Sequence, residues 1–319
     1  MNTNEEDARW RALLRSRTVA RLDALAPLEG YNLTALPDVR LLRSNRPLTA
    51  TPVLYDPGIV IVCQGRKRGY FGGKTYVYDD QHYLAVSVPV PFTMETDASA
   101  AEPLLAIYLH LDFALAADLM LQLAQQGTTG DAHPTGMMAT PMDARMAASV
   151  LRFLDALGDG VEAAILGRAL LRELYLHVLA GEQGGALRAA LSQQGRFGNV
   201  ARAIRRIHQD YRAGIGVDAL AAEAGMSVPS FHAHFRSVTN TSPMQYLKSI
   251  RLHQARLLMA RTGMTAASAC YDVGYGSPSQ FSREFRRLFG RTPLEEVKRM
   301  KAEFALPPVQ AASDYVSSH

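Results

Sequence analysis

This sequence of 319 residues contains few cysteines and no long apolar run. Its two cysteines, Cys63 and Cys270, are too few for a disulfide framework in a chain of this length. No stretch reaches the roughly 18 apolar residues that span a bilayer, and the start, MNTNEEDARW, has no apolar core of the signal-peptide type. We therefore expect a cytoplasmic protein that makes no membrane contact.

Motifs of the common enzyme classes are also missing. The sequence shows no nucleophile triad, no phosphate-cradling glycine loop and no CxxC pair. We therefore expect a protein that is not an enzyme and has no cofactor. Its length allows two domains, each with its own core.

Charge is distributed unevenly between the two parts of the chain. The segment from Arg196 to Lys301 holds 17 Lys and Arg against 7 Asp and Glu, whereas the rest of the chain holds 17 against 23. A basic segment joined to an acidic one is typical of a nucleic-acid-binding domain that carries a second domain with another task.

One short pattern occurs twice within the basic segment. It reads LAAEAGMSVPSFHAHFR from Leu220 to Arg236 and ACYDVGYGSPSQFSREFR from Ala269 to Arg286. In both copies a short helical run ends at a glycine that can adopt positive φ, and a serine and a proline then begin a second helix. Each second helix has two phenylalanines four residues apart, which places both rings on one buried face. The pattern predicts two helix-turn-helix motifs.

The segment between the copies predicts a connecting helix. From Ser242 to Arg261 a capping serine and a proline precede apolar residues at helical spacing. About nineteen residues at 1.5 Å each make a rod of roughly 28 Å. Two recognition helices at that separation fit successive major-groove turns, which repeat every ~34 Å along a duplex.

These residues resemble the AraC/XylS family of bacterial transcription regulators. The resemblance covers Asn199 to Lys301 and is carried by YLKSIRLHQARLLM and DVGYGSPSQFSREFRRLFGRTP. It implies an all-α, homeodomain-like domain with two helix-turn-helix motifs that binds double-stranded promoter DNA and acts on RNA polymerase.

The amino-terminal half predicts strands followed by helices. Between Leu33 and Leu111, short runs rich in Val, Ile, Leu and Tyr alternate with turn signals such as Asp56-Pro57-Gly58 and Pro89 to Pro91. This spacing is typical of a small antiparallel barrel or jelly roll. Helical periodicity then predicts helices at residues 113–125, 142–157 and 161–179, and an amphipathic helix at residues 10–28 packed on this domain.

The segment YDPGIVIVCQGRKRGYFGGKTYVYDDQHYLAVSVPVP resembles the cupin-like amino-terminal domain of one AraC-type subgroup, over residues 32–123. The resemblance implies a barrel that binds a small-molecule effector and helices that carry homodimer contacts. The expected architecture is therefore a two-domain α+β protein: a cupin-like β-barrel with flanking helices at residues 1–183, a linker at 184–198, the DNA-binding domain at 199–303 and a disordered tail at 304–319.

Helical geometry selects the side chains that would reach DNA. With the paired phenylalanines turned inward, the opposite faces present groups that match the family's DNA-reading positions. The expected base-reading residues are Pro229, His232, Ala233, Ser279, Gln280 and Arg283. The expected phosphate-binding residues are Arg236, Lys248, Arg251, Arg286 and Arg287. For Arg251 an internal salt bridge to Asp218 or Glu223 is the alternative.

Two further site hypotheses concern the barrel. Cupin-like barrels can hold metals through clustered histidines, but His82 stands alone, and Asp112 beside His110 is explained by capping of the following helix. We therefore expect no metal. Cys63 is followed by the cations Arg66, Lys67 and Arg68, which would favour a redox-sensing thiolate, although a small core residue is the simpler interpretation.

Two other functions remain open at this stage. The barrel could serve only for dimerisation, so that the regulator ignores small molecules. Alternatively, the chain could be a metal-dependent cupin enzyme fused to a DNA-binding domain. The sequence identifies neither an effector nor its binding residues.

Overall fold

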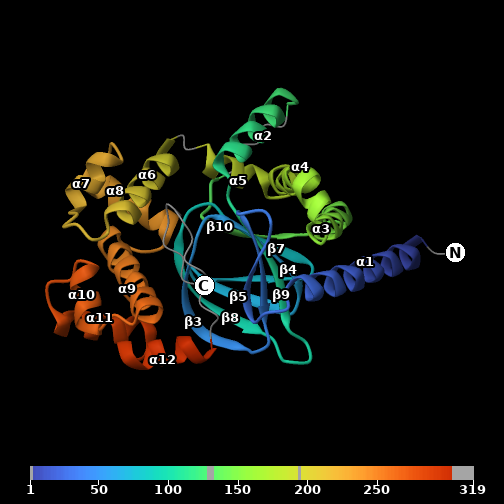
Figure 1. Ribbon diagram of the computed structural model, residues 1–319. Coiled ribbons are helices and arrows are strands. Elements are labelled where there is room, and N and C mark those ends of the chain that lie inside the picture. Colours follow the sequence, from blue (N-terminus) through green and yellow to red (C-terminus); the bar gives the residue numbers. More distant parts are fainter. Residues whose placement is uncertain (1–2, 128–132, 193–194, 304–319) are drawn as a thin grey trace.

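A strongly curved antiparallel sheet forms the first part of the molecule, and helices form the second (Figure 1). The structure, a computed structural model, describes residues 3–127, 133–192 and 195–303. Within these ranges ten strands make one sheet of order β1-β2-β9-β4-β7-β6-β5-β8-β3, and β10 pairs with β7. The strands are β1 (Gly30–Leu33), β2 (Val39–Ser44), β3 (Leu48–Tyr55), β4 (Gly58–Gln64), β5 (Arg66–Phe71), β6 (Lys74–Asp79), β7 (His82–Val86), β8 (Val90–Asp97), β9 (Leu104–His110) and β10 (Met137–Pro141).

Both faces of this half-barrel are buried, which explains the unbroken apolar run in β4. Ile59 and Ile61 point to the outer face, where they join one core, whereas Val60 and Val62 point to the inner face and join another. A strand covered on both sides needs apolar residues at every position rather than at alternate ones.

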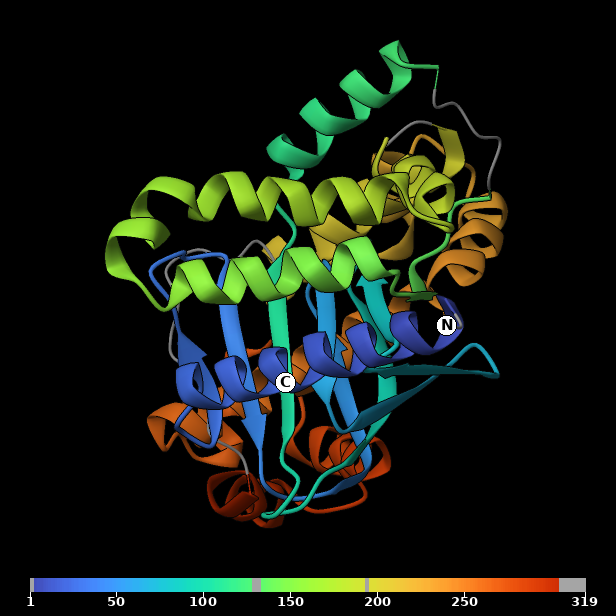
Figure 2. The ribbon, with the colours of Figure 1, turned by 90° about the vertical axis from the view of Figure 1, so that its right-hand side faces the viewer.

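Helices cover the outer face of the sheet. Figure 2 shows three of them lying across the strands: α1 (Thr3–Leu25), α3 (Ala144–Leu157) and α4 (Gly160–Ala180). The predicted packing of the first helix is confirmed, because Leu14 and Leu22 of α1 are buried. The helix α2 (Phe113–Gln125) extends away from the body of the domain (Figure 1).

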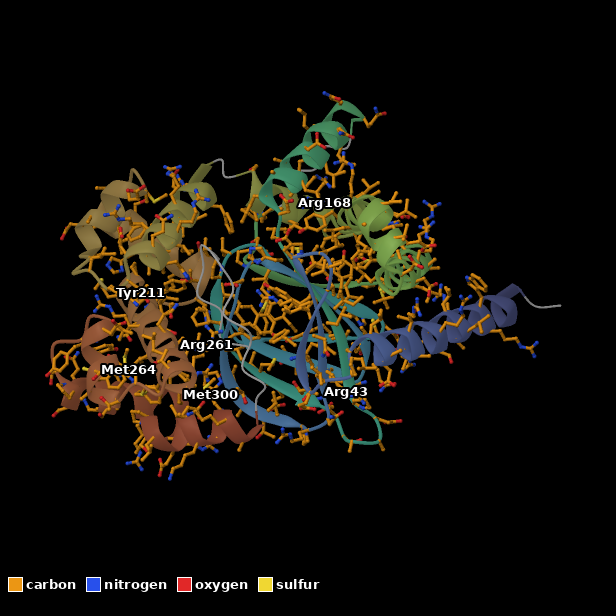
Figure 3. All side chains as sticks on the ribbon, viewed as in Figure 1. Arg43, Arg168, Tyr211, Arg261, Met264 and Met300 are labelled. Atoms are coloured by element: carbon orange, nitrogen blue, oxygen red, sulfur yellow. The ribbon has the colours of Figure 1, made fainter. Side chains whose placement is uncertain are left out.

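The helical part contains two small cores joined by one long helix. The helices are α5 (Gly184–Leu191), α6 (Gly195–Asp210), α7 (Val217–Glu223), α8 (Val228–Thr239), α9 (Pro243–Thr262), α10 (Ala266–Asp272), α11 (Pro278–Phe289) and α12 (Pro293–Glu303). One core gathers Phe231 and Phe235 around the start of α9, and the other gathers Phe281 and Phe285 around its second half. Tyr211 packs against both (Figure 3). In the described parts of the chain no helix is long and apolar enough to span a bilayer.

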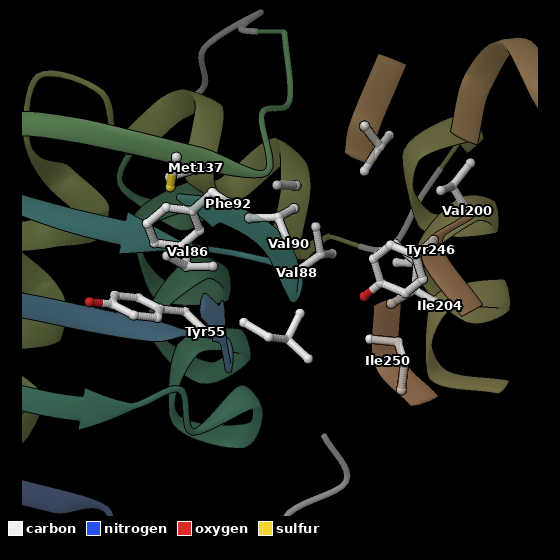
Figure 4. Packing of buried hydrophobic residues seen from close by; sticks show 14 of the residues in the cluster. Tyr55, Val86, Val88, Val90, Phe92, Met137, Val200, Ile204, Tyr246 and Ile250 are labelled. Carbon is white, nitrogen blue, oxygen red and sulfur yellow. The ribbon is translucent and has the colours of Figure 1, made fainter. Parts of the chain in front are cut away.

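The inner face of the half-barrel packs against the first helical core. Val88 and Val90 lie opposite Tyr246 and Ile250 in one continuous apolar cluster (Figure 4). The Tyr246 hydroxyl donates a hydrogen bond to the Pro89 carbonyl of the barrel over 2.8 Å. The helical domain is therefore docked on the barrel through a buried apolar interface that contains a specific hydrogen bond.

A buried ion cluster marks the far end of this interface. The Arg256 guanidinium is 1% exposed and lies 3.1 Å from Glu296, which is fully buried and also pairs with Arg299. The same guanidinium lies 4.6 Å from the centre of the Phe289 ring. Arg256 of α9 also donates to the Pro52 carbonyl of β3 over 3.5 Å, so its ion pair with Glu296 of α12 lies on the side that faces the barrel.

Two expectations about the chain need correction. Small and polar residues led us to expect a linker at residues 184–198. The segment is mostly helical, and burial of Leu187 and Leu191 holds α5 against its neighbours. The turn expected from Pro89 to Pro91 lies slightly earlier: the chain bends at residues 87–88, and β8 already begins at Val90. Pro91 pairs with Leu54 but lies beyond the end of the β5 pairing, so its missing N–H removes no ladder bond on that side. The tail expected at 304–319 lies outside the described residues.

Candidate nucleic-acid interface

Two glycines set the angle at which each recognition helix leaves its turn. Gly225 and Gly274 have φ of +62° and +88°, as the sequence pattern predicts. A Cβ at position 274 would lie 2.5 Å from the Arg212 carbonyl oxygen, so only glycine fits there without movement of the backbone. Ser277 caps α11, accepting a bond from the Gln280 amide over 3.4 Å, whereas Ser227 makes no side-chain cap bond at the start of α8.

The buried phenylalanines turn one face of each recognition helix toward solvent. In α8, Pro229, Ala233 and Arg236 are exposed and His232 is half-buried. In α11, Ser279, Arg283, Arg286 and Arg287 are exposed and Gln280 is half-buried. Within the described ranges no intramolecular ion pair involves Arg236 of α8 or the three arginines of α11. Their charges therefore face solvent at both ends of the α9 rod.

Gln280 and Lys248 are engaged within the domain by a buried carboxylate. The Glu284 side chain accepts bonds from Lys248 over 2.8 Å, from Tyr275 over 2.8 Å and from Gln280 over 3.2 Å. Burial alone would raise the pKa of Glu284, but these donors hold it below its usual value. Gln280 must therefore give up a bond to Glu284 to read a base with its amide.

Arg251 has three partners inside the domain. Its guanidinium donates to the backbone carbonyls of Tyr211, Ala213 and Gly274 over 2.7, 2.8 and 3.0 Å. The sequence leaves two roles open for Arg251, binding of a DNA phosphate and a salt bridge to Asp218 or Glu223. Its three backbone carbonyl partners correspond to neither role. Arg251 clamps the loop after α6 to the turn before α11, and phosphate binding would require it to break that clamp.

A crevice of about 380 Å³ separates these helices from the barrel. Its helical wall includes Lys248 and Arg287, and its barrel wall includes Tyr70 and Phe92. Two of the expected phosphate-binding side chains therefore line the boundary between the domains as well as the helical surface.

Comparison with known protein families matches both halves of the chain. Residues 35–186 match the AraC-type transcriptional regulator N-terminus, and residues 220–299 match a helix-turn-helix domain. The chain belongs to the AraC family of transcription regulators. Both the resemblance and the two-domain α+β class predicted from the sequence are thereby confirmed.

Several AraC-type relatives cover part or most of the chain. The RCS-specific activator RclR of Escherichia coli is 38% identical over 85 residues, which are 27% of this chain and 30% of RclR. The thermoregulatory protein LcrF of Yersinia pestis is 23% identical over 75% of this chain and 88% of its own length. Three of the curated relatives, RclR among them, are matched over only 30% to 48% of their own lengths.

Solved structures show the same fold over most of the chain. The apo form of a single-residue variant of ToxT from Vibrio cholerae superimposes with a TM-score of 0.55 at 10% identity, covering 85% of this AraC-type chain and 99% of the ToxT chain. Wild-type ToxT with bound unsaturated fatty acid gives a TM-score of 0.52 at 11% identity, over 85% and 97% of the two chains.

Cys63 of this AraC-type chain is part of the buried core of the barrel domain. Cys63 is 4% exposed, and burial, followed by the Asp80 carboxylate, raises the pKa of its thiol to about 12. The cations expected to favour a thiolate lie elsewhere: Arg66 pairs with Asp79, and Arg68 with Glu95 and Asp97. The structure therefore argues against thiolate-based redox sensing.

The potential metal ligands are engaged in other contacts. Asp112 caps α2 by accepting from the amides of Ala114 and Leu115, as predicted, and His82 lies 3.0 Å from Asp79. Across the described ranges no group of three or more His, Cys, Asp or Glu side chains has the spacing of a metal site.

Proposed function

We propose that this AraC-type regulator binds double-stranded promoter DNA with α8 and α11 in successive turns of the major groove. The observation that carries the proposal is the pair of exposed recognition faces at the two ends of the rigid α9 helix. Arg283 supplies a forked donor for guanine O6 and N7. Pro229, His232, Ala233, Ser279 and Gln280 complete the proposed base-reading set, and Arg236, Arg286 and Arg287, with Lys248, bind phosphates.

Substitution of Arg283 tests this assignment. Arg283→Ala should weaken binding to the preferred site by about 1–3 kcal/mol and relax the preference at one base pair. Arg283→Lys, which keeps the charge but loses the fork, should relax that preference as well. Arg168→Ala on α4, remote from the recognition helices (Figure 3), removes one exposed arginine as the matched control. A uniform loss on every sequence would make Arg283 a phosphate ligand instead.

A small-molecule effector controls the proposed DNA binding. Support comes from the ToxT fold, which one solved structure shows with an unsaturated fatty acid bound, and from the docking of the barrel on the DNA-binding domain. An effector that binds one docked arrangement more tightly than another shifts the population of DNA-competent molecules.

The regulator acts as a homodimer in the cytoplasm and contacts RNA polymerase. Dimerisation is supported by an exposed apolar stripe on α4, where Val161 and Ile165 are 68% and 72% exposed and Leu176 continues the same face. Ile165→Glu should convert dimers to monomers in sedimentation velocity, whereas Leu166→Glu, an exposed position about 100° further around the same helix, should leave them intact.

The two alternative functions gain no support from the site. A wholly apolar interior would favour a barrel that serves only for dimerisation, but Lys67, Tyr55 and Tyr78 are buried inside this one. A metal-dependent enzyme needs a donor cluster, and the described His82 and Asp112 make other contacts.

A further inference from the structure

Lys67 is buried inside the half-barrel. It lies on β5 and is 3% exposed. In the sheet register it stands directly opposite Tyr78 on β6 and Thr96 on β8. Directly opposite residues of antiparallel strands project to the same face, so these three side chains form one row across the inner wall.

The ammonium of Lys67 has no carboxylate partner in the described parts of the chain. Its two contacts are the Tyr55 hydroxyl at 3.4 Å and the Met94 sulfur at 3.0 Å. The acidic side chains near β5 pair with its outward neighbours Arg66 and Arg68 instead. A buried cation without a counter-charge is costly, and burial lowers the pKa of Lys67 to about 7.

Three hydroxyls near Lys67, those of Thr96, Tyr55 and Tyr78, can donate hydrogen bonds. Thr96 Oγ1 is buried and has no hydrogen-bond partner within the described residues. The hydroxyls of Tyr55 and Tyr78 lie 3.3 Å apart, and Tyr55 also donates to the Met94 sulfur over 2.9 Å. Lys67 and Tyr55 both donate to the Met94 sulfur. A thioether is a weak acceptor, so these two donors lack a strong hydrogen-bond acceptor at the point where they meet.

We propose that Lys67 binds the carboxylate of a small-molecule effector, with Thr96, Tyr55 and Tyr78 donating to the same group. One ammonium among neutral hydroxyls matches a monoanion rather than a doubly charged phosphate. The surrounding inner wall is apolar, including Val62, Leu84 and Leu104, which fits an apolar body attached to the carboxylate. The inference rests on the proposed effector control and identifies the chemical class of that effector.

Phe92 lies at the crevice between the domains and contacts Tyr55, the neighbour of Lys67. This ring fills the space that a side chain at Gly69 would take, lies edge-on 4.8 Å from Tyr55 and also lines the crevice between the domains. In Figure 4 the Tyr55 hydroxyl points away from the helical domain, into the barrel. Rotation of Phe92 and Met94, a flexible side chain, would connect the 380 Å³ crevice with Lys67. The apolar body of the effector would then occupy the boundary between the domains.

The test uses the full-length chain and a series of sodium carboxylates. Thermal unfolding and calorimetric titration with straight-chain carboxylates from acetate to dodecanoate, and with benzoate, are compared with the methyl esters of the same acids. Wild type should bind at least one acid and not its ester. Lys67→Met should lose about 10–100-fold in affinity, the range for one hydrogen bond to a charged group. Thr96→Val should lose about 10-fold or more, because its hydroxyl would donate to the same charged carboxylate.

Lys74→Met, which removes an exposed lysine from β6 of the same barrel, is the matched control and should bind like wild type. Equal affinity in Lys67→Met and wild type would overturn the inference, and so would a panel in which no acid binds wild type. If wild type still binds promoter DNA and responds to a neutral compound, only the inference about Lys67 fails. A protein that binds no specific DNA would overturn the proposed function itself.

Discussion

Replacing Lys67 by methionine should stabilise the free protein. Burial lowers the pKa of this lysine from 10.5 to about 7. Each tenfold change in a protonation equilibrium is worth about 1.4 kcal/mol, so keeping this charge in the folded state costs on the order of 5 kcal/mol. Methionine has a similar length and carries no charge, so Lys67→Met should recover most of that cost and raise Tm on the order of 10 °C.

The pH dependence follows from the same pKa. Below about pH 7 the lysine is charged in both the folded and the unfolded chain, and the folded state bears the full cost. Between about 7 and 10.5 the unfolded chain binds the extra proton, so stability rises with pH, and the cost is gone above 10.5. The facing groups Tyr55 and Tyr78 stay neutral in this window, because burial raises the pKa of both.

Differential scanning calorimetry from about pH 7 to 9.5, within the window set by this pKa, measures both effects. The variant should unfold at higher temperature at neutral pH and should lack the part of the rise with pH that the wild type owes to Lys67. Lys74→Met, which removes an exposed lysine, should leave Tm and its pH dependence unchanged. The reasoning is refuted if Lys67→Met has a wild-type Tm or keeps the wild-type pH slope.

Three further predictions concern other parts of the molecule. Gly274→Ala should destabilise the DNA-binding domain by more than about 1 kcal/mol in urea unfolding, because φ is +88° and the added Cβ meets the Arg212 carbonyl, whereas Gly276→Ala, which meets no atom within 4 Å, should cost less. Tyr246→Phe should cost about 1–3 kcal/mol of stability, because the hydroxyl donates to the Pro89 carbonyl and also lies 2.8 Å from Nε2 of buried His208, and a fully stable variant would argue against this buried contact. Cys63 should resist iodoacetamide at mildly alkaline pH in the folded chain, because the pKa of its buried thiol is raised to about 12, and rapid alkylation under native conditions would restore the redox-sensing hypothesis.

Local signals in the sequence predicted the helical domain well. The positive φ of Gly225 and Gly274 and the burial of the paired phenylalanines depend on residues a few positions apart, which a sequence shows directly. The partners of Arg251 could not be predicted, because the carbonyls it binds belong to Tyr211, Ala213 and Gly274, and their proximity depends on tertiary packing.

The barrel was predicted less completely for two physical reasons. Composition indicated a linker at residues 184–198, but α5 buries leucines that the glycines around it obscured. The burial of Lys67 was not predicted, because the run Arg66-Lys67-Arg68 has the composition of one exposed cationic cluster. The alternation of a strand separates it: Arg66 and Arg68 point outward to acidic partners, and Lys67 points inward. The alternation of side chains along a strand, with a period of two residues, could therefore have predicted that Lys67 points inward.

Selection of binding sites from random duplex DNA by the full-length protein tests the central claim most directly. If α8 and α11 enter successive groove turns, the selected sequences should contain two preferred blocks about 10 base pairs apart. Arg283→Ala should then relax the preference at one base pair of one block and leave the other block unchanged. Selected sequences with no shared block, bound equally well by the variant, would contradict the assignment of these two helices as sequence-reading elements.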